Sequence, residues 1–307
     1  MKYFFAVLIA ALAPSVCISC NGGASTADTP AADSTPAPIE ISESESSENE
    51  LSVFRHVNRV ARYAAKATMD DEPMDFYIEN SVHLFWPQTI KGRKPVKLQQ
   101  ALLDAMTATE GEYTDLDKVV EFLLQDKSSS PAAEEDLSTA YHEVKSIPSN
   151  AYMNKGTTAV GLSLSSDPND RILVTRVSHE WYGGGAHGMN ADDYVNYDII
   201  EDRVLQLTDM VTDTVKLRQV ITQALLEQVG AENMGELMNQ GYLIGDGQVP
   251  LPSAFYCRDF NLHMVYQPYE IACYAVGSVD VEVQYYRLDD AGITTKYLQN
   301  LVDYYTR

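Results

Sequence analysis

Side chains able to bind a metal ion or transfer a proton are concentrated in Ser178–Gly188, which reads Ser-His-Glu-Trp-Tyr-Gly-Gly-Gly-Ala-His-Gly. His179, Glu180 and His187, followed by Asp192, carry suitable donor atoms. The metalloprotease pattern needs two histidines four residues apart on a helix. Here they are eight positions apart, and strand alternation would place His179 and Glu180 on opposite faces. We favour a glycine-shaped hairpin. The alternative is a hydrolase or metal-binding enzyme using His179, His187 and nearby acids.

A second unusual segment, Tyr266–Gly277, reads Tyr-Gln-Pro-Tyr-Glu-Ile-Ala-Cys-Tyr-Ala-Val-Gly. Its tyrosines, proline and glycine lie between two strand-like patterns and predict a rigid aromatic loop. Tyrosine offers a large contact area at a low cost in side-chain entropy, which suits a binding surface. The same rings could instead pack against the sheet, and the sequence leaves both interpretations open.

No serine or cysteine has the sequence context of a catalytic nucleophile. The Gly-x-Ser-x-Gly pattern of α/β-hydrolases is absent from the sequence. Cys257 and Cys273 either form a disulfide in an oxidising compartment or remain two buried thiols. We assign no catalytic residue, metal or cofactor, and expect a protein without enzymatic activity.

The elements that hold these segments are predicted from hydrophobic periodicity. Aromatic and β-branched residues predict a strand or hairpin at Phe76–Trp86. Alternating patterns of period two predict strands at Leu173–Trp181, Val195–Ile199, Leu262–Tyr266 and Val279–Tyr285. Helical spacing predicts helices at Phe54–Met69, Pro95–Ala105, Leu116–Leu124, Leu217–Leu225 and Thr294–Tyr305. Thr114 and Asp117 resemble a capping box, and Gly230 resembles a helix C-terminus. The predicted strands and helices are grouped along the chain and do not alternate regularly, which predicts an α+β fold. We expect an antiparallel sheet with helices packed on it, in two sub-domains of one compact unit.

The N-terminus has the features of an export signal. Lys2 precedes the apolar run Phe4–Ala13, which is shorter than the ~20 residues of a membrane span. Cys17-Ile-Ser-Cys20 follows and resembles a bacterial lipobox, with Cys20 as the lipidated residue. We therefore expect a lipoprotein signal peptide at 1–19 and a lipid anchor in the cell envelope. The expected site is the outer membrane facing the periplasm, with the cell surface as the alternative.

Composition divides the remaining chain. Residues 20–50 are rich in Ser, Pro and acids and lack aromatics, so we expect a disordered linker. We expect an N-terminal α+β sub-domain at 51–148 and a C-terminal α+β domain at 149–307. The chain has 44 acidic and 22 basic residues, a net charge of −22. This charge disfavours nucleic acid and would attract a cationic protein.

Several motifs together resemble a known family. They are Tyr182-Gly-Gly-Gly-Ala-His-Gly188, Val195–Asp198, Leu207–Met210, Phe255-Tyr256 and Gln267–Ala275. The set is similar to the RsiV-like C-terminal domain family, DUF3298. The preceding half, 51–148, is similar to the DUF4163 domain that partners it in RsiV and PdaC.

The resemblance implies an extracellular α+β module that binds something in the cell wall. In RsiV the module binds lysozyme, and in PdaC it accompanies an enzyme that modifies peptidoglycan. The partner expected here is therefore a cationic, lysozyme-like protein or a peptidoglycan fragment, with the membrane contacted through the lipid alone. A purely structural envelope lipoprotein is a further alternative. The expected binding residues are Tyr182, Gly183, Gly184, His187, Pro268, Tyr269, Glu270 and Tyr274.

Overall fold

The computed structural model describes residues 52–69, 72–125, 152–163, 171–182, 187–245 and 247–305. The chain divides into two units, Met1–Glu40 and Ile41–Arg307, and every described residue belongs to the second. The expected signal peptide, Cys20 and the linker to residue 50 lie outside the described residues. Within that described part, no helix is both long and apolar enough to span a membrane.

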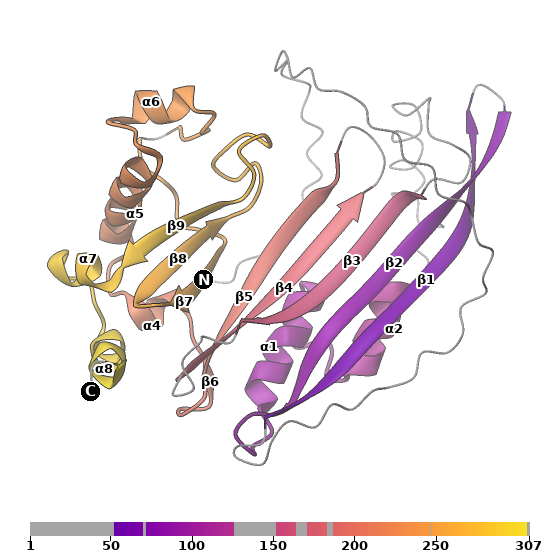
Figure 1. Cartoon of the computed structure of the whole chain (residues 1–307), viewed down its shortest axis with the longest axis horizontal. Helices are drawn as coiled ribbons and strands as arrows, with labels where there is room; N and C mark the ends of the chain where they lie inside the picture. The colour runs from indigo at the N-terminus through magenta and orange to yellow at the C-terminus, as the bar shows by residue number, and fades with distance from the viewer. Residues whose placement is uncertain are drawn as a thin grey trace. The chain divides into compact units, whose positions relative to one another are not determined.

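The larger sheet has six strands in the order β1-β2-β3-β4-β5-β6 (Figure 1). They are β1 (Val53–Met69), β2 (Glu72–Thr89), β3 (Tyr152–Ser163), β4 (Ile172–Tyr182), β5 (Met189–Asp198) and β6 (Arg203–Val204). Neighbours are antiparallel except β2 and β3, which are parallel. The expected division at 148/149 therefore falls within one sheet, because β3–β6 complete a sheet that β1 and β2 begin.

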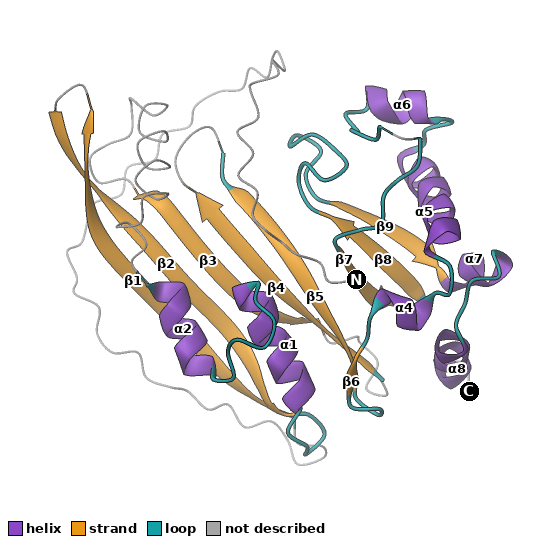
Figure 2. Cartoon of the chain, turned by 180° about the vertical axis from the view of Figure 1, so that it is seen from behind, coloured by secondary structure: helices purple, strands orange, loops and turns teal. Residues whose placement is uncertain are grey.

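Helices α1 (Val96–Thr107) and α2 (Leu116–Leu124) cover one face of this sheet (Figure 2). The buried side chains of α1 recur every three or four positions, at Leu98, Leu102 and Met106, which is the apolar stripe of a packed helix. They form one core with Leu84 of β2 and other residues of the sheet. This core holds the first half of the fold together.

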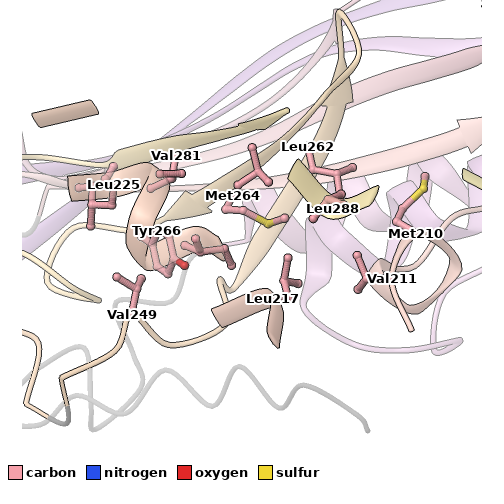
Figure 3. Packing of buried hydrophobic residues seen from close by; sticks show 14 of the residues in the cluster. Met210, Val211, Leu217, Leu225, Val249, Leu262, Met264, Tyr266, Val281 and Leu288 are labelled. Carbon is pink, nitrogen blue, oxygen red and sulfur yellow. The ribbon is translucent and has the colours of Figure 1, made fainter. Parts of the chain in front are cut away.

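The second sheet has the order β7-β8-β9 and is antiparallel. Its strands are β7 (Ala254–Arg258), β8 (Asn261–Tyr266) and β9 (Val279–Gln284). The accompanying helices are α4 (Leu207–Met210), α5 (Thr214–Val229), α6 (Met234–Asn239), α7 (Tyr285–Asp290) and α8 (Lys296–Tyr305). Figure 3 shows Leu217 and Leu225 of α5 in the core with Met264 and Val281 of the sheet. The mixed helices and antiparallel strands confirm the predicted α+β class.

Asn196 of β5 joins the two sheets. Its amide nitrogen donates to the Phe255 carbonyl of β7 at 2.9 Å, and its amide oxygen accepts from the Cys257 backbone N–H at 2.9 Å. The side chain is buried, with an exposed fraction of 1%. One amide thus makes the pair of hydrogen bonds that a neighbouring strand would make along the edge of β7.

The predicted helix at Phe54–Met69 is wrong, because this segment forms strand β1. A helix would place Val57 and Val60 on the same face, whereas Val57 is buried and Val60 is 47% exposed. The spacing of the apolar residues in this segment is compatible with the period of a helix and with that of a strand. Pairing with β2 along the whole segment decides the outcome, because tertiary contacts override weak local propensity.

The predicted capping box at Thr114 and Asp117 is also wrong. Helix α2 begins at Leu116, and its N-cap is Asp115. The Asp115 carboxylate accepts hydrogen bonds from the backbone N–H groups of Asp117 and Lys118 at 2.9 and 3.2 Å. Asp115 is one residue nearer the helix than Thr114, so its short side chain satisfies the exposed N–H groups directly. Gly230 ends α5 in the left-handed conformation, as predicted.

Candidate functional site

The structure brings the two unusual sequence segments together through His187 and Tyr274. Their rings stack with centroids 3.6 Å apart and planes 13° apart. The Tyr274 hydroxyl donates to the Gly188 carbonyl at 2.8 Å, so the tyrosine is held by its hydroxyl as well as by its ring. These contacts fix the end of the glycine-rich segment against the aromatic loop.

Tyr269 is the third ring of this surface. Its ring centroid lies 5.8 Å from that of Tyr274, and half of its surface is exposed, 50%. Its backbone is in the left-handed region, with φ of 70°, which is costly for a residue with a Cβ. We call His187, Tyr269 and Tyr274 the aromatic cluster. The loop therefore keeps a large ring in solvent at a cost in backbone strain.

Gln267 attaches the loop to the edge of β5. The Asp192 backbone N–H donates to the Gln267 side-chain oxygen at 2.9 Å, and the Gln267 side-chain nitrogen donates to the Asp192 carbonyl at 2.7 Å. The Gln267 amide therefore makes the pair of hydrogen bonds that a neighbouring strand would make with β5. Asn196 makes the equivalent pair from β5 to the backbone of β7. The base of the loop is thus fixed to the strand that follows His187.

Glu270 holds the loop from within. Its carboxylate accepts from the Ser253 backbone N–H at 2.9 Å, from the Ser253 hydroxyl at 2.8 Å and from the Gln267 backbone N–H at 2.8 Å. Burial raises the pKa of Glu270, and these hydrogen bonds act in the opposite direction. Pro268 is buried. Pro268 and Glu270, both expected to contact a ligand, therefore shape the loop from inside it.

A short backbone ladder anchors the far side of the loop. The Cys273 N–H donates to the Gly241 carbonyl at 2.9 Å, and the Leu243 N–H donates to the Ile271 carbonyl at 2.7 Å. The Leu243 side chain is 61% exposed. With one flank on β5 and the other on 241–243, the loop is pre-organised, which lowers the entropic cost of binding.

Asp192 supports the site from β5. Its carboxylate accepts two hydrogen bonds from Arg176, at 2.9 and 2.8 Å, and one from the Ser178 hydroxyl at 2.6 Å. The residue is 8% exposed, so its charge is compensated where it is buried. Asp192 is a structural anchor of the β5 edge in this arrangement.

The structure does not gather the residues of the metal alternative. His179 lies half-buried with Nε2 3.3 Å from the Ala105 carbonyl of α1, and burial lowers its pKa. His187 is exposed beside Tyr274, and Glu180 is exposed on β4. Within the described ranges, no group of three or more His, Cys, Asp or Glu side chains is placed to hold a metal ion. Gly183, Gly184 and the side chain of Tyr182 lie outside what the structure describes.

Cys257 and Cys273 are both free thiols, so the structure corrects the disulfide alternative. Burial raises the pKa of Cys257 to about 12, and the Tyr285 hydroxyl is hydrogen bonded to its sulfur. The Cys273 sulfur instead faces Gly241, where an added Cβ would lie 3.0 Å away. Each sulfur has its own packing partner, and the high pKa of Cys257 disfavours the reactive thiolate.

Comparison with known families assigns part of the chain. Residues 208–286 match the family described as "Protein of unknown function (DUF3298)". These residues form a DUF3298 domain. No curated protein matches the chain. The assignment covers β7, β8 and β9 together with the aromatic loop.

Two solved structures of DUF3298 proteins are similar to the chain. A member from Bacteroides fragilis is 19% identical, covers 82% of this chain and 98% of its own, and has a TM-score of 0.58. A member from Pseudomonas aeruginosa is 16% identical, covers 82% of this chain and 97% of its own, and has a TM-score of 0.46. The first similarity shows that the fold is shared across most of the chain.

The aromatic cluster crosses the border of the DUF3298 domain. Tyr269 and Tyr274 lie within the matched residues, whereas His187 and Asp192 precede them. The sequence indicated the rings but missed Gln267 and Ser253 as the residues that hold the loop. The signal available was the Gln-Pro-Tyr-Glu order, because a glutamate three residues after an N–H donor can close a loop on itself.

Proposed function

We propose that the protein is a non-catalytic binding module of the cell envelope that recognises a cationic, lysozyme-like protein through the aromatic cluster. The observation that carries this proposal is the stack of His187 on Tyr274 beside the exposed ring of Tyr269. Partly exposed tyrosines on a fixed loop are typical anchors of protein interfaces. Peptidoglycan is the second candidate, since aromatic rings also suit sugar faces.

The construction of the loop supports binding over catalysis. The carboxylates near the cluster, Glu270 and Asp192, are occupied by hydrogen bonds within the protein. A general acid or base must have an oxygen available to the substrate. The acidic side chains here serve to hold a surface in place.

Charge supports a cationic partner. The net charge of −22 creates a long-range field that steers positive proteins toward the molecule and repels polyanions. Such steering mainly raises the association rate, while the contacts that the exposed rings make with the partner would set the dissociation rate. The proposed division of roles is attraction by the whole chain and specificity by the aromatic cluster.

We further propose that the module is lipid-anchored through Cys20 after removal of residues 1–19, at the outer membrane facing the periplasm. The lipobox-like Cys17–Cys20 and the apolar run Phe4–Ala13 support this location. Residues 20–50 would act as the tether. Mass spectrometry of the protein from a membrane fraction tests this point: a diacylglyceryl group on Cys20 is expected, and an unmodified Cys20 contradicts it.

Titration of the purified protein with hen lysozyme and, separately, with peptidoglycan fragments tests the binding function. Calorimetry at two salt concentrations should show saturable lysozyme binding that persists at the higher salt. Tyr269→Ala should weaken it by about tenfold or more, the scale of an interface anchor. Tyr274→Phe should weaken it less, because the ring stays while the bond to the Gly188 carbonyl is lost.

Tyr286→Ala is the matched control, because Tyr286 lies on α7 and is 60% exposed. Its affinity should match that of the unmodified protein. Binding that disappears at the higher salt concentration would show that the interaction consists of charge attraction alone. A binding heat with peptidoglycan and none with lysozyme would show that the aromatic cluster recognises glycan. No binding heat with either ligand would contradict the proposed binding function.

A further inference from the structure

The turn between β2 and α1 carries an isolated group of basic residues. Residues 91–97 contain four of the 22 basic residues of the chain, and residues 80–103 contain no acidic residue. Lys91, Arg93 and Lys94 are exposed, and within the described part of the chain none of the three forms an ion pair. We call Lys91–Lys94 the basic turn. On a chain with a net charge of −22, it is a local positive surface.

Backbone hydrogen bonds hold the basic turn in one conformation. Ile90 and Arg93 exchange two N–H···O=C bonds, of 2.8 and 3.0 Å. Between them, Lys91 and Gly92 have φ of 46° and 72°, and two such residues are typical of a tight hairpin turn. The Lys91 N–H also donates to the Ser52 hydroxyl at 3.2 Å. The basic side chains are therefore attached to a fixed backbone.

Exposed aliphatic side chains border the basic turn. Val53, the first residue of β1, is 42% exposed, and Val96, the first residue of α1, is 59% exposed. Ile200 is 54% exposed in the turn between β5 and β6, which lies at the same end of the larger sheet (Figure 2). The Lys97 ammonium connects the two turns by donating to the Asp202 carbonyl at 2.7 Å. Aliphatic side chains beside basic ones are typical of surfaces that contact anionic lipid.

We propose that the basic turn, with Val53 and Val96 beside it, docks onto the anionic headgroups of a lipid bilayer. The ammonium and guanidinium groups pair with headgroup phosphates, while the valines contact the interface. The acidic remainder of the chain repels the same lipids. This repulsion is weak at the basic turn, because charges more than about 8 Å apart are largely screened at physiological ionic strength.

The place where the chain enters the fold selects a membrane as the occupant. Ser52, the first described residue, is hydrogen bonded to the basic turn. This step rests on the proposed lipid anchor at Cys20, which leaves a tether of about 30 residues with a root-mean-square length of about 30 Å if flexible. The tether keeps the basic turn close to the membrane, so a weak headgroup contact suffices. An acidic protein in solution has no such advantage.

Docking through the basic turn directs the aromatic cluster away from the membrane. Strand β5 begins at Met189, next to the cluster, and ends at Asp198, next to the β5–β6 turn. Its 10 residues span about 33 Å at the rise of a strand. The aromatic cluster is then open to a protein that arrives from the aqueous side. The membrane contact has two parts, whereas the sequence predicted a contact through the lipid alone.

Vesicle sedimentation tests the proposal, with residues 20–307 carrying Cys20→Ser. This form keeps every described residue, cannot be lipidated, and lacks the apolar run Phe4–Ala13, which would itself enter a bilayer. It should bind vesicles made of equal parts of phosphatidylglycerol and phosphatidylcholine, and bind pure phosphatidylcholine far more weakly. Inorganic phosphate at constant ionic strength should not displace it, because a single phosphate cannot replace a surface of many headgroups.

Variants connect the binding to the basic turn. The triple variant replaces its basic residues by glutamine: Lys91→Gln, Arg93→Gln and Lys94→Gln. It should lower the vesicle partition coefficient by about tenfold or more, because each basic residue near an anionic surface contributes about fivefold. The control variant removes the same charge from exposed residues of α2, β7 and α8: Lys118→Gln, Arg258→Gln and Lys296→Gln. It should bind as the unmodified protein does, and both variants should keep the thermal midpoint, since exposed charges add little stability.

Tryptophan reporters locate the contact. Val96→Trp places an indole beside the basic turn, and Leu243→Trp places one beside the aromatic loop, at a residue that is 61% exposed. Anionic vesicles should shift the emission of the first variant to shorter wavelength and leave that of the second unchanged. Trp86 and Trp181 are present in both and supply the common background.

Four results would overturn the proposal. They are no preference for anionic vesicles, displacement by inorganic phosphate, an equal loss of binding in the triple and control variants, and an emission shift in Leu243→Trp in place of Val96→Trp. Binding of polyglutamate without binding of vesicles would assign the basic turn to an acidic protein. An unmodified Cys20 would remove the tether but leave the vesicle result unchanged, so the two proposals fail separately.

Discussion

At Tyr269 the requirements of stability and of surface exposure oppose each other. The residue has a φ of 70° and a half-exposed ring, so its backbone conformation costs free energy while much of its side chain stays in solvent. We expect Tyr269→Gly to leave the free energy of unfolding unchanged or to raise it by up to about 1 kcal/mol. Glycine relieves the backbone strain, but it also increases the conformational entropy of the unfolded chain, which partly offsets the gain.

Chemical denaturation of Tyr269→Gly and Tyr269→Ala measures this effect. The alanine variant removes the same ring but keeps a Cβ in the left-handed region. Lysozyme binding should be weakened equally in both, whereas stability should be higher in the glycine variant. Equal stability of the two would contradict the assignment of strain to this position.

Thr175 illustrates the cost of an unpaired hydroxyl. Its side chain is fully buried, and within the described residues its Oγ1 has no hydrogen-bond partner. Thr175→Val replaces the hydroxyl by a methyl group of similar volume. We expect the free energy of unfolding to rise by about 1 kcal/mol, because an unsatisfied buried oxygen is removed.

Thr222→Val is the control of opposite sign. The Thr222 hydroxyl donates to the Arg218 carbonyl at 2.7 Å and accepts from the Val249 N–H at 3.0 Å. Its removal should lower stability by about 1 to 2 kcal/mol. If urea denaturation moved both variants in the same direction, hydrogen-bond satisfaction would not explain either.

Between elements, side-chain amides replace strand pairing. Asn196→Ala would leave the Phe255 carbonyl and the Cys257 N–H without their partner at the edge of β7. We expect a loss of about 2 to 4 kcal/mol, because two buried backbone groups become unsatisfied. Asn300→Ala on the exposed face of α8 is the control and should change stability little. A similar loss in both variants would contradict the joining role.

Helix α8 is attached to the larger sheet through a buried carboxylate. Asp198 is fully buried and accepts hydrogen bonds from Arg171 at 2.7 Å and from the Tyr297 hydroxyl of α8 at 2.6 Å. The backbone N–H groups of Ile200 and Glu201 donate to its second oxygen, each at 2.8 Å. Burial alone would raise the pKa of Asp198, but Arg171 and the other donors hold it below the ordinary value.

The lowered pKa predicts how stability depends on pH. The contribution of ionised Asp198 is fully present above the unfolded pKa, about 3.9, and is lost as the pH falls through the lower pKa of the folded state. Asp198→Asn should cost about 3 kcal/mol at neutral pH, and the difference from the unmodified protein should narrow in acid. Denaturation curves between neutral and acidic pH measure this, and a constant difference would contradict it.

Across the whole molecule, two cores share the same strands. Leu173 and Val177 of β4 belong to the core under α1, while Ile172 and Val174 of the same strand belong to the core around α5. Adjacent residues of one strand therefore face different cores. We expect a single cooperative unfolding transition, because neither core can lose β4 independently.

Thermal unfolding followed by two probes tests this coupling. The chain has two tryptophans, so Trp181→Phe leaves the buried Trp86 as a fluorescence probe of the first core. Far-ultraviolet circular dichroism is dominated by helices, including α5. The two curves should coincide. Separate midpoints would show that the halves before and after residue 148 unfold independently.

Local pattern by itself determined much of this protein. The alternation in β4, β8 and β9 and the stop of α5 at Gly230 depend on neighbouring residues in the chain, so the sequence predicted them correctly. The two aromatic and glycine-rich segments were also recognisable from composition. Such features need no knowledge of distant partners.

Only the tertiary structure decided how these parts meet. The Tyr274 hydroxyl reaches a carbonyl 86 positions away, and Gln267 pairs with a backbone 75 positions away. β1 became a strand because β2 pairs with it, although its apolar spacing also suited a helix. Hydrogen bonds and ring contacts gain their value from partners that the fold brings within reach. The role of Glu270 inside the loop, and of Tyr269 outside it, could therefore be read only from the folded chain.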